Sequence, residues 1–246
     1  MKGIQLPASK QQRALNARTV MVSFSGVDGA GKSTQIEALR ARAEHAGLRV
    51  HVVRFWDDIA RLKTIRETSG HKLFKGDKGV GSPSVPINRR DKNVQSGPIT
   101  CIRLFLYLLD AGSTRLVFHR MQRSGFNLVI FDRYTYDELA NLNLDNPLMR
   151  TYARMLMAFV PRPHISYVLD ADPAQARARK PEYPLDFVER NRSAYWRLAD
   201  LLGGMTIIPA MPVRDVEAEV LAHAAEKLLS PASGTAHDRW PAERRA

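Results

Sequence analysis

The alternation of apolar and polar positions predicts a chain in which strands and helices follow one another. Short runs rich in β-branched and aromatic residues predict strands over residues 20–24, 48–55, 127–131, 164–169 and 206–208. Apolar residues at helical spacing predict helices over 33–46, 99–124, 135–143, 146–159, 173–179, 184–202 and 213–229. Asp57 or Asp58 can cap one more helix, which would run to about Thr68. This order predicts an α/β fold with a parallel sheet and functional residues at the carboxyl ends of its strands.

Three stretches depart from this pattern. Residues 1–18 are polar and basic and predict a disordered leader without the apolar segment of a secretory signal. Residues 69–98 predict a long basic loop, and residues 230–246 predict a disordered polar tail. No internal repeat is visible, so residues 19–229 are predicted to form one domain. No apolar run is long enough to span a bilayer, so no membrane association is expected.

Composition narrows the classes of function. A hydrophobic content of 44% and a charged content of 25% are ordinary for a globular protein. The single cysteine, Cys101, excludes an internal disulfide and a cysteine-rich metal site, and it favours the cytoplasm. The net charge of +12 raises the question of nucleic acid, but no RNA- or DNA-binding motif occurs. Part of the excess charge lies in the leader and the long loop, so nucleic acid is not the favoured partner.

The strongest local signal lies between the first predicted strand and the first predicted helix. Gly26, Gly31, Lys32 and Ser33 have the spacing G-x-x-x-x-G-K-S, the P-loop, in the strand–loop–helix setting that phosphate binding requires. Its glycines let the backbone approach a ligand closely, and the helix N-terminus adds positive charge. The pattern predicts ATP with its phosphates in the loop, Lys32 at the β- and γ-phosphates and Ser33 on Mg²⁺. The predicted phosphate-binding residues are Gly26, Gly29, Ala30, Gly31, Lys32, Ser33 and Thr34.

Charged residues follow three other predicted strands at the same edge of the sheet. Asp132 follows an apolar strand and is the preferred candidate for anchoring Mg²⁺, while Asp170 is a competing candidate by the same argument. Either aspartate could instead be a structural cap. Arg54 and Arg133 can hold an acceptor phosphate bidentately, and the alternative for each is a surface or packing role.

The motifs resemble those of thymidylate kinases. Residues 24–35, Phe-Ser-Gly-Val-Asp-Gly-Ala-Gly-Lys-Ser-Thr-Gln, are similar to the family signature F-E-G-x-D-x-x-G-K-S-T-Q. Asp132-Arg133-Tyr134 resembles the D-R-Y motif, and residues 168–173 resemble the strand that leads into the lid. The motifs occur in family order across about residues 19–229. The resemblance implies a nucleoside monophosphate kinase fold with five parallel strands, and Mg²⁺-dependent phosphoryl transfer from ATP to a nucleoside monophosphate. The best candidate is conversion of dTMP to dTDP, a step of nucleotide biosynthesis.

The same resemblance implies roles for residues on the acceptor side. Asp28 would receive the sugar hydroxyl of the acceptor, and Arg54 and Arg133 would hold its phosphate. Tyr107 falls where the family stacks an aromatic ring on the base, with plain core packing as the alternative. The family's base-reading arginine falls at Ala111.

The chain departs from the family pattern at this position and at Gly29. Because that base-reading arginine is missing, Arg103 or Arg115, on the same helical face, would have to substitute for it. Gly29 stands where some members place a P-loop arginine, so positive charge for the transition state would come from Arg177 and Arg179 in a short lid over residues 177–186. The alternative for these two arginines is a solvated helix face.

Two other functions remain open at this stage. The missing base-reading arginine and the long loop favour a kinase of the same fold that acts on a different small acceptor. A non-catalytic ATP-binding module is the third hypothesis, against which the intact P-loop argues. The resemblance also suggests a homodimer through the helices that flank the acceptor site.

Overall fold

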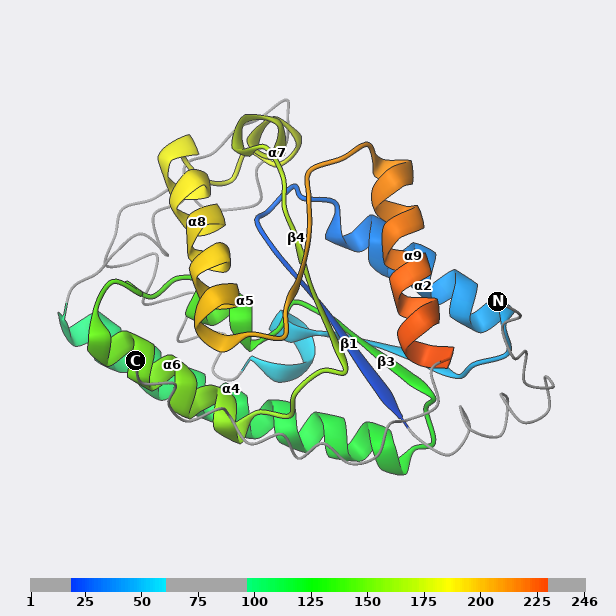
Figure 1. Cartoon of the computed structure of the whole chain (residues 1–246). Coiled ribbons are helices and arrows are strands. Elements are labelled where there is room, and N and C mark those ends of the chain that lie inside the picture. Colours follow the sequence, from blue (N-terminus) through cyan, green and yellow to red (C-terminus); the bar gives the residue numbers. More distant parts are fainter. Residues whose placement is uncertain (1–18, 61–96, 230–246) are drawn as a thin grey trace, which may run out of the picture.

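The computed structural model describes residues 19–60 and 97–229 (Figure 1). The predicted leader, the predicted tail and nearly all of the predicted long loop lie outside the described residues. The described strands form one parallel sheet in the order β2-β3-β1-β4-β5, which confirms the α/β fold. The strands are β1 (Val20–Ser25), β2 (Val50–Arg54), β3 (Leu128–Asp132), β4 (Ile165–Leu169) and β5 (Thr206–Ile208).

The central strand β1 sets the register of the sheet. It pairs with β3 on one side, where Val20 lies opposite Leu128, and with β4 on the other, where Val22 lies opposite Ile165. Its residues are almost all buried, as expected for a parallel strand covered by helices on both faces. Because side chains alternate across a strand, Met21 faces one core cluster and Val22 the other.

Helices cover both faces of the sheet (Figure 1). One core cluster joins the sheet to α4 (Gly97–Arg123), α5 (Thr135–Leu139), α6 (Pro147–Phe159) and α8 (Leu185–Leu202). The other core cluster joins the opposite face to α2 (Lys32–His45) and α9 (Val213–Leu229). The short helix α7 (Pro173–Arg179) follows β4 directly and lies at the edge where the strands end (Figure 1). Within the described residues, no helix combines the length and apolar character needed to cross a bilayer.

Helix ends follow the local signals in the sequence. Gly47 has φ +80° just after α2, the left-handed conformation that terminates helices. Asn146 accepts a hydrogen bond from the N–H of Leu148 at the start of α6. Asp172 accepts one from the N–H of Gln175 at the start of α7. Such caps satisfy backbone donors that have no partner within the helix.

The segment after β2 differs from the prediction. The chain forms a π-helical turn, η1 (Phe55–Ile59), and Asp57 and Asp58 lie inside this turn. The Asp58 carboxylate accepts the backbone N–H of Arg54 at 2.7 Å and so caps a helical turn that begins earlier than predicted. The rest of the helix predicted to run to Thr68 lies outside the described residues.

Candidate active site

The loop between β1 and α2 requires its glycines. Gly26, Gly29 and Gly31 have φ values of +132°, +86° and +88°, which side chains other than that of glycine rarely adopt. A Cβ at Gly26 would overlap the carbonyl oxygen of Leu169, and a Cβ at Gly29 would overlap that of Ala176 in α7. A Cβ at Gly31 would meet nothing. The loop is therefore packed against β4 and α7 at two glycines and open at the third.

Lys32 is folded back onto this loop. Its Nζ donates hydrogen bonds to the carbonyl oxygens of Gly26 at 2.7 Å and Val27 at 2.8 Å. The side chain is buried, and burial, together with the nearby Arg133 guanidinium, lowers the pKa of Lys32 to about 8. The ammonium is thus a desolvated charge beside the backbone of the loop.

An open groove of about 560 Å³ runs beside the loop, a volume that suits a nucleotide-sized ligand. It is bounded by the end of the loop, the start of α2, the start of α7 and the segment 208–213 after β5. Arg179 lines the groove, and its guanidinium donates to the carbonyl oxygen of Gly29 at 2.9 Å. The structure therefore brings this lid arginine to the P-loop.

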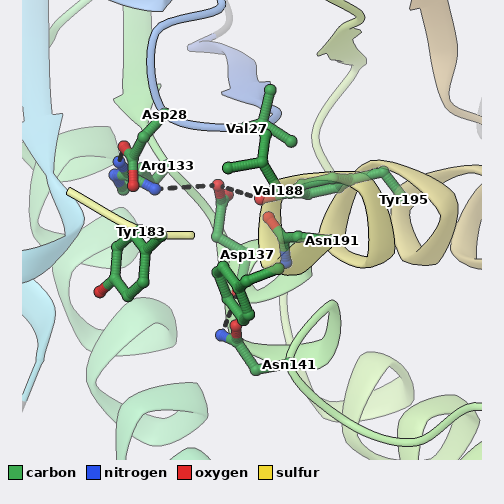
Figure 2. Close-up of a pocket in the computed structure, with 10 residues that line it drawn as sticks. Val27, Asp28, Arg133, Asp137, Asn141, Tyr183, Val188, Asn191 and Tyr195 are labelled. Carbon is green, nitrogen blue, oxygen red and sulfur yellow. Dashed lines mark hydrogen bonds and ion pairs between the residues drawn. The ribbon is translucent and has the colours of Figure 1, made fainter. Parts of the chain in front are cut away.

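Arg133 lines a separate cavity, which shares no lining residue with this groove, and forms an ion pair with Asp28 (Figure 2). Its φ of +70° is in the left-handed region, which is uncommon for a residue other than glycine. Burial alone would lower the pKa of Arg133, but the carboxylates of Asp28 and Asp137 raise it above its ordinary value. The Nζ of Lys180 lies 3.7 Å from the Asp28 carboxylate. Two cations thus face the carboxylate inside the loop.

Asp137 in α5 belongs to this site, although the sequence analysis did not single it out. Its carboxylate accepts hydrogen bonds from Ser25 Oγ at 2.7 Å, from the Tyr134 N–H at 2.9 Å and from the Tyr195 hydroxyl at 2.8 Å (Figure 2 shows the approach of Tyr195). The Arg133 guanidinium lies 3.5 Å from it. An acid in the first turn of a helix is a common capping signal. The sequence therefore gives no separate indication that this side chain also contacts distant segments.

A small cavity of about 10 Å³ lies among these groups, with room for about one water molecule (Figure 2). Asp28, Arg133 and Asp137 line one part of it. The amide side chains of Asn141 and Asn191 line another part. The cavity is too small for a nucleotide, so an acceptor could enter here only if side chains moved.

The two candidate magnesium anchors have different surroundings. The Asp170 carboxylate is held by Arg192 in a bidentate ion pair, with both N–O distances 2.6 Å. Asp132 ends β3 and is one of the carboxylates whose charge acts on Lys32. Within residues 19–60 and 97–229, no group of three or more His, Cys, Asp or Glu side chains could hold a metal ion on its own.

The remaining predicted residues have different surroundings. Arg177 donates from Nε to the carbonyl oxygen of Tyr183 at 3.0 Å, so this lid arginine braces the α7–α8 connection. Arg54 is exposed at the end of β2, an outer strand of the sheet. Tyr107 is 5% exposed and packs in the core cluster that includes Val27. Arg103 is half-buried on α4.

Comparison with known proteins places these motifs in a family. The chain is 31% identical over 190 residues to a thymidylate kinase of Bifidobacterium longum, an alignment that covers 73% of this chain and 84% of the relative. It is 28% identical over 231 residues to a thymidylate kinase of Solidesulfovibrio magneticus, covering 85% of this chain and all of the relative. A probable thymidylate kinase of Methanosphaera stadtmanae is 24% identical over 199 residues, covering 79% and 91% of the two chains. No protein-family model matches the chain. On the identity and coverage of these relatives, the chain belongs to the thymidylate kinase family.

Proposed function

We propose that this protein transfers the γ-phosphoryl group of ATP to a nucleoside monophosphate, and that dTMP is its acceptor. One observation carries the proposal: residues of the P-loop line both an open groove of nucleotide size and a second cavity that holds the partly buried Asp28–Arg133 pair. A kinase needs a donor site and an acceptor site on either side of the transferred phosphate. The relatives named thymidylate kinase support dTMP as the acceptor.

The donor side fits ATP. The positive φ angles of Gly26, Gly29 and Gly31 form the backbone cradle that phosphate oxygens require, and the groove beside it would take the base and sugar. We infer that Lys32 exchanges its two loop carbonyls for phosphate oxygens when a nucleotide binds. Arg179 is the lid residue that would reach the phosphates, because its guanidinium already donates a hydrogen bond to the carbonyl oxygen of Gly29 in this loop. Ala30 and Thr34 line the same groove.

The residues present also fit Mg²⁺. Ser33 would ligate the ion, as the second residue of α2, and Asp132 would support it from the end of β3. The ion pair with Arg192 engages both oxygens of Asp170, which favours Asp132. When bound, Mg²⁺ supplies charge neutralisation at the phosphates, and the two residues determine where that charge sits.

The acceptor side rests on Arg133 and Asp28. A guanidinium with a pKa held above its ordinary value remains charged and can take a phosphate in bidentate geometry. We propose that Asp28 then exchanges its pairing with Arg133 for the sugar hydroxyl of the acceptor. Arg54 would reach the acceptor phosphate from the end of β2, and Tyr107 or Arg103 would contact the base from α4.

A different acceptor is the second candidate. It is favoured by Ala111, which is 3% exposed and packed in the core where the family's base-reading arginine is expected. An alanine there cannot donate hydrogen bonds to a base, so base selection has to come from other side chains.

A coupled ADP-release assay over a panel of nucleoside monophosphates and nucleosides separates the hypotheses. Turnover with dTMP above the other acceptors supports the proposal. Turnover only with another acceptor selects the second candidate. ATP binding without any turnover selects a non-catalytic ATP-binding module.

The same assay tests the P-loop assignment through Lys32→Ala. Loss of this cation should reduce phosphoryl transfer by at least about a hundredfold, because it removes charge stabilisation where charge develops. Circular dichroism should show an unchanged fold, since the side chain bonds only to loop carbonyls. Substantial transfer by the folded variant would contradict the assignment.

A further inference from the structure

Asp137 connects three segments that are far apart in the sequence. Its side chain is 2% exposed and accepts hydrogen bonds from the last residue of β1, from the turn before α5 and from α8. The donors are Ser25 Oγ, the Tyr134 N–H and the Tyr195 hydroxyl. A buried carboxylate is costly unless it is well satisfied, and this one has three donors and a neighbouring guanidinium.

Asp137 contacts both halves of the site, through an ion pair on one side and a hydrogen bond on the other. Toward the acceptor, its Oδ1 lies 3.5 Å from the Arg133 guanidinium, which also pairs with Asp28. Toward the donor, it holds the Tyr195 hydroxyl, which lies 3.3 Å from the Gly26 carbonyl oxygen. That same carbonyl accepts the hydrogen bond of Lys32.

Arg133 needs such support. Its left-handed backbone conformation costs free energy and persists only where neighbouring groups fix it. When Asp28 turns to an acceptor, Asp137 is the carboxylate that remains beside the guanidinium. Because Asp137 is itself fixed by three hydrogen bonds, it can hold Arg133 in place throughout the reaction.

We propose that Asp137 is a positioning residue for acceptor binding, which keeps Arg133 aimed at the acceptor phosphate while Asp28 changes partner. The proposal rests on the proposed function of Arg133. It predicts that removing the negative charge of Asp137 weakens acceptor binding even in a variant that remains folded.

The direct test is the position of Arg133 itself. In a spectrum of ¹⁵N-labelled full-length protein, the Nε–H signal of Arg133, assigned through its loss in Arg133→Gln, should shift or broaden in Asp137→Asn. Asp145→Asn is the matched control, because Asp145 pairs with Arg197 at 2.9 Å on the surface, and it should leave that signal unchanged. An unchanged Arg133 signal in folded Asp137→Asn overturns the proposal. This test does not depend on turnover, so it remains decisive if the panel assay rejects the proposed function.

The kinetic test uses the acceptor that the wild-type protein turns over. Asp137→Asn should raise the KM of the acceptor about tenfold and that of ATP less than twofold, because the substitution removes the negative charge beside Arg133, whereas the link toward Lys32 runs through the neutral Tyr195 hydroxyl. In an Arg133→Gln background, the same substitution should add little to the acceptor KM, because Asp137 acts through Arg133. Equal increases in both KM values, or full additivity with Arg133→Gln, would show a role in folding alone. If Asp137→Asn does not fold, Tyr195→Phe removes one of the three hydrogen bonds and should give a smaller change in the same direction.

Discussion

At the scale of single residues, Lys32 is the most informative titratable group. Burial lowers its pKa from 10.5 to about 8, so the lysine is partly neutral just above pH 8. A bound polyphosphate favours the charged form and raises the pKa again, because it replaces lost hydration with negative charge. Nucleotide binding and proton binding are therefore coupled at this residue.

This coupling predicts proton uptake when ATP binds. At pH 8.5, binding should take up about three quarters of a proton, the deprotonated fraction of a group with a pKa near 8. Calorimetric titration in buffers with different ionisation enthalpies measures it, and the affinity for ATP should fall as the pH rises above 8. At pH 6.5 the lysine is already charged, so uptake at Lys32 should vanish. A binding enthalpy that is independent of buffer at pH 8.5 would contradict the lowered pKa.

Tyr107 distinguishes base stacking from core packing. If its ring contacts the acceptor base, Tyr107→Ala should raise the KM of the acceptor about tenfold or more and leave that of ATP nearly unchanged. Leu106→Ala is the control, because Leu106 is its neighbour in α4 and is also buried, at 7% exposed. Both variants lose core packing, and thermal unfolding measures that loss. Equal kinetic effects of the two substitutions would assign Tyr107 to the core alone.

At the scale of elements, the strands and most helices could be predicted closely from the sequence. A parallel strand buried on both faces is a short apolar run, and β3 and β4 begin and end within one residue of the prediction. The turn η1 could not be predicted, because a π-helical turn has no distinct periodicity at that length. Asp137 was missed for a different reason: its partners Ser25 and Tyr195 come from segments that only the folded sheet brings together.

The contact between α7 and the P-loop gives a prediction at this scale. Gly29 and Gly31 have nearly the same φ, so alanine at either position costs about 1 kcal/mol of backbone strain. Only at Gly29 would the new methyl group also overlap a carbonyl oxygen of α7, that of Ala176. Gly29→Ala should therefore displace α7 from the loop, whereas Gly31→Ala should not.

Hydrogen exchange measures this difference directly. The amides of Ala176 and Lys180 donate to carbonyls within the α7 segment, and their exchange reports how firmly that helix is docked. We expect faster exchange over residues 173–180 in Gly29→Ala than in Gly31→Ala. Equal rates in the two variants would show that α7 keeps its structure without the close approach at Gly29.

At the scale of the whole molecule, one face has an unusual surface. Helices α4 and α6 expose several large apolar side chains to solvent. They are Ile102, Phe105, Leu116, Leu148 and Phe159, exposed by 54%, 58%, 52%, 72% and 58%. Large exposed apolar side chains on two helices in mutual contact are typical of interfaces.

This surface predicts that two copies of the chain associate through α4 and α6, in agreement with the dimer that the family resemblance suggests. A symmetric dimer places the same patch on both partners, so one new charge appears twice in the interface. Phe105→Glu and Phe159→Glu should each convert the dimer to a monomer, measured as a halved mass in light scattering at fixed protein concentration. Val213→Glu is the control, because Val213 is similarly exposed, at 54%, but begins α9 on the opposite face of the sheet. A wild-type protein that is monomeric at that concentration would contradict the prediction, as would a dimer that survives both phenylalanine substitutions.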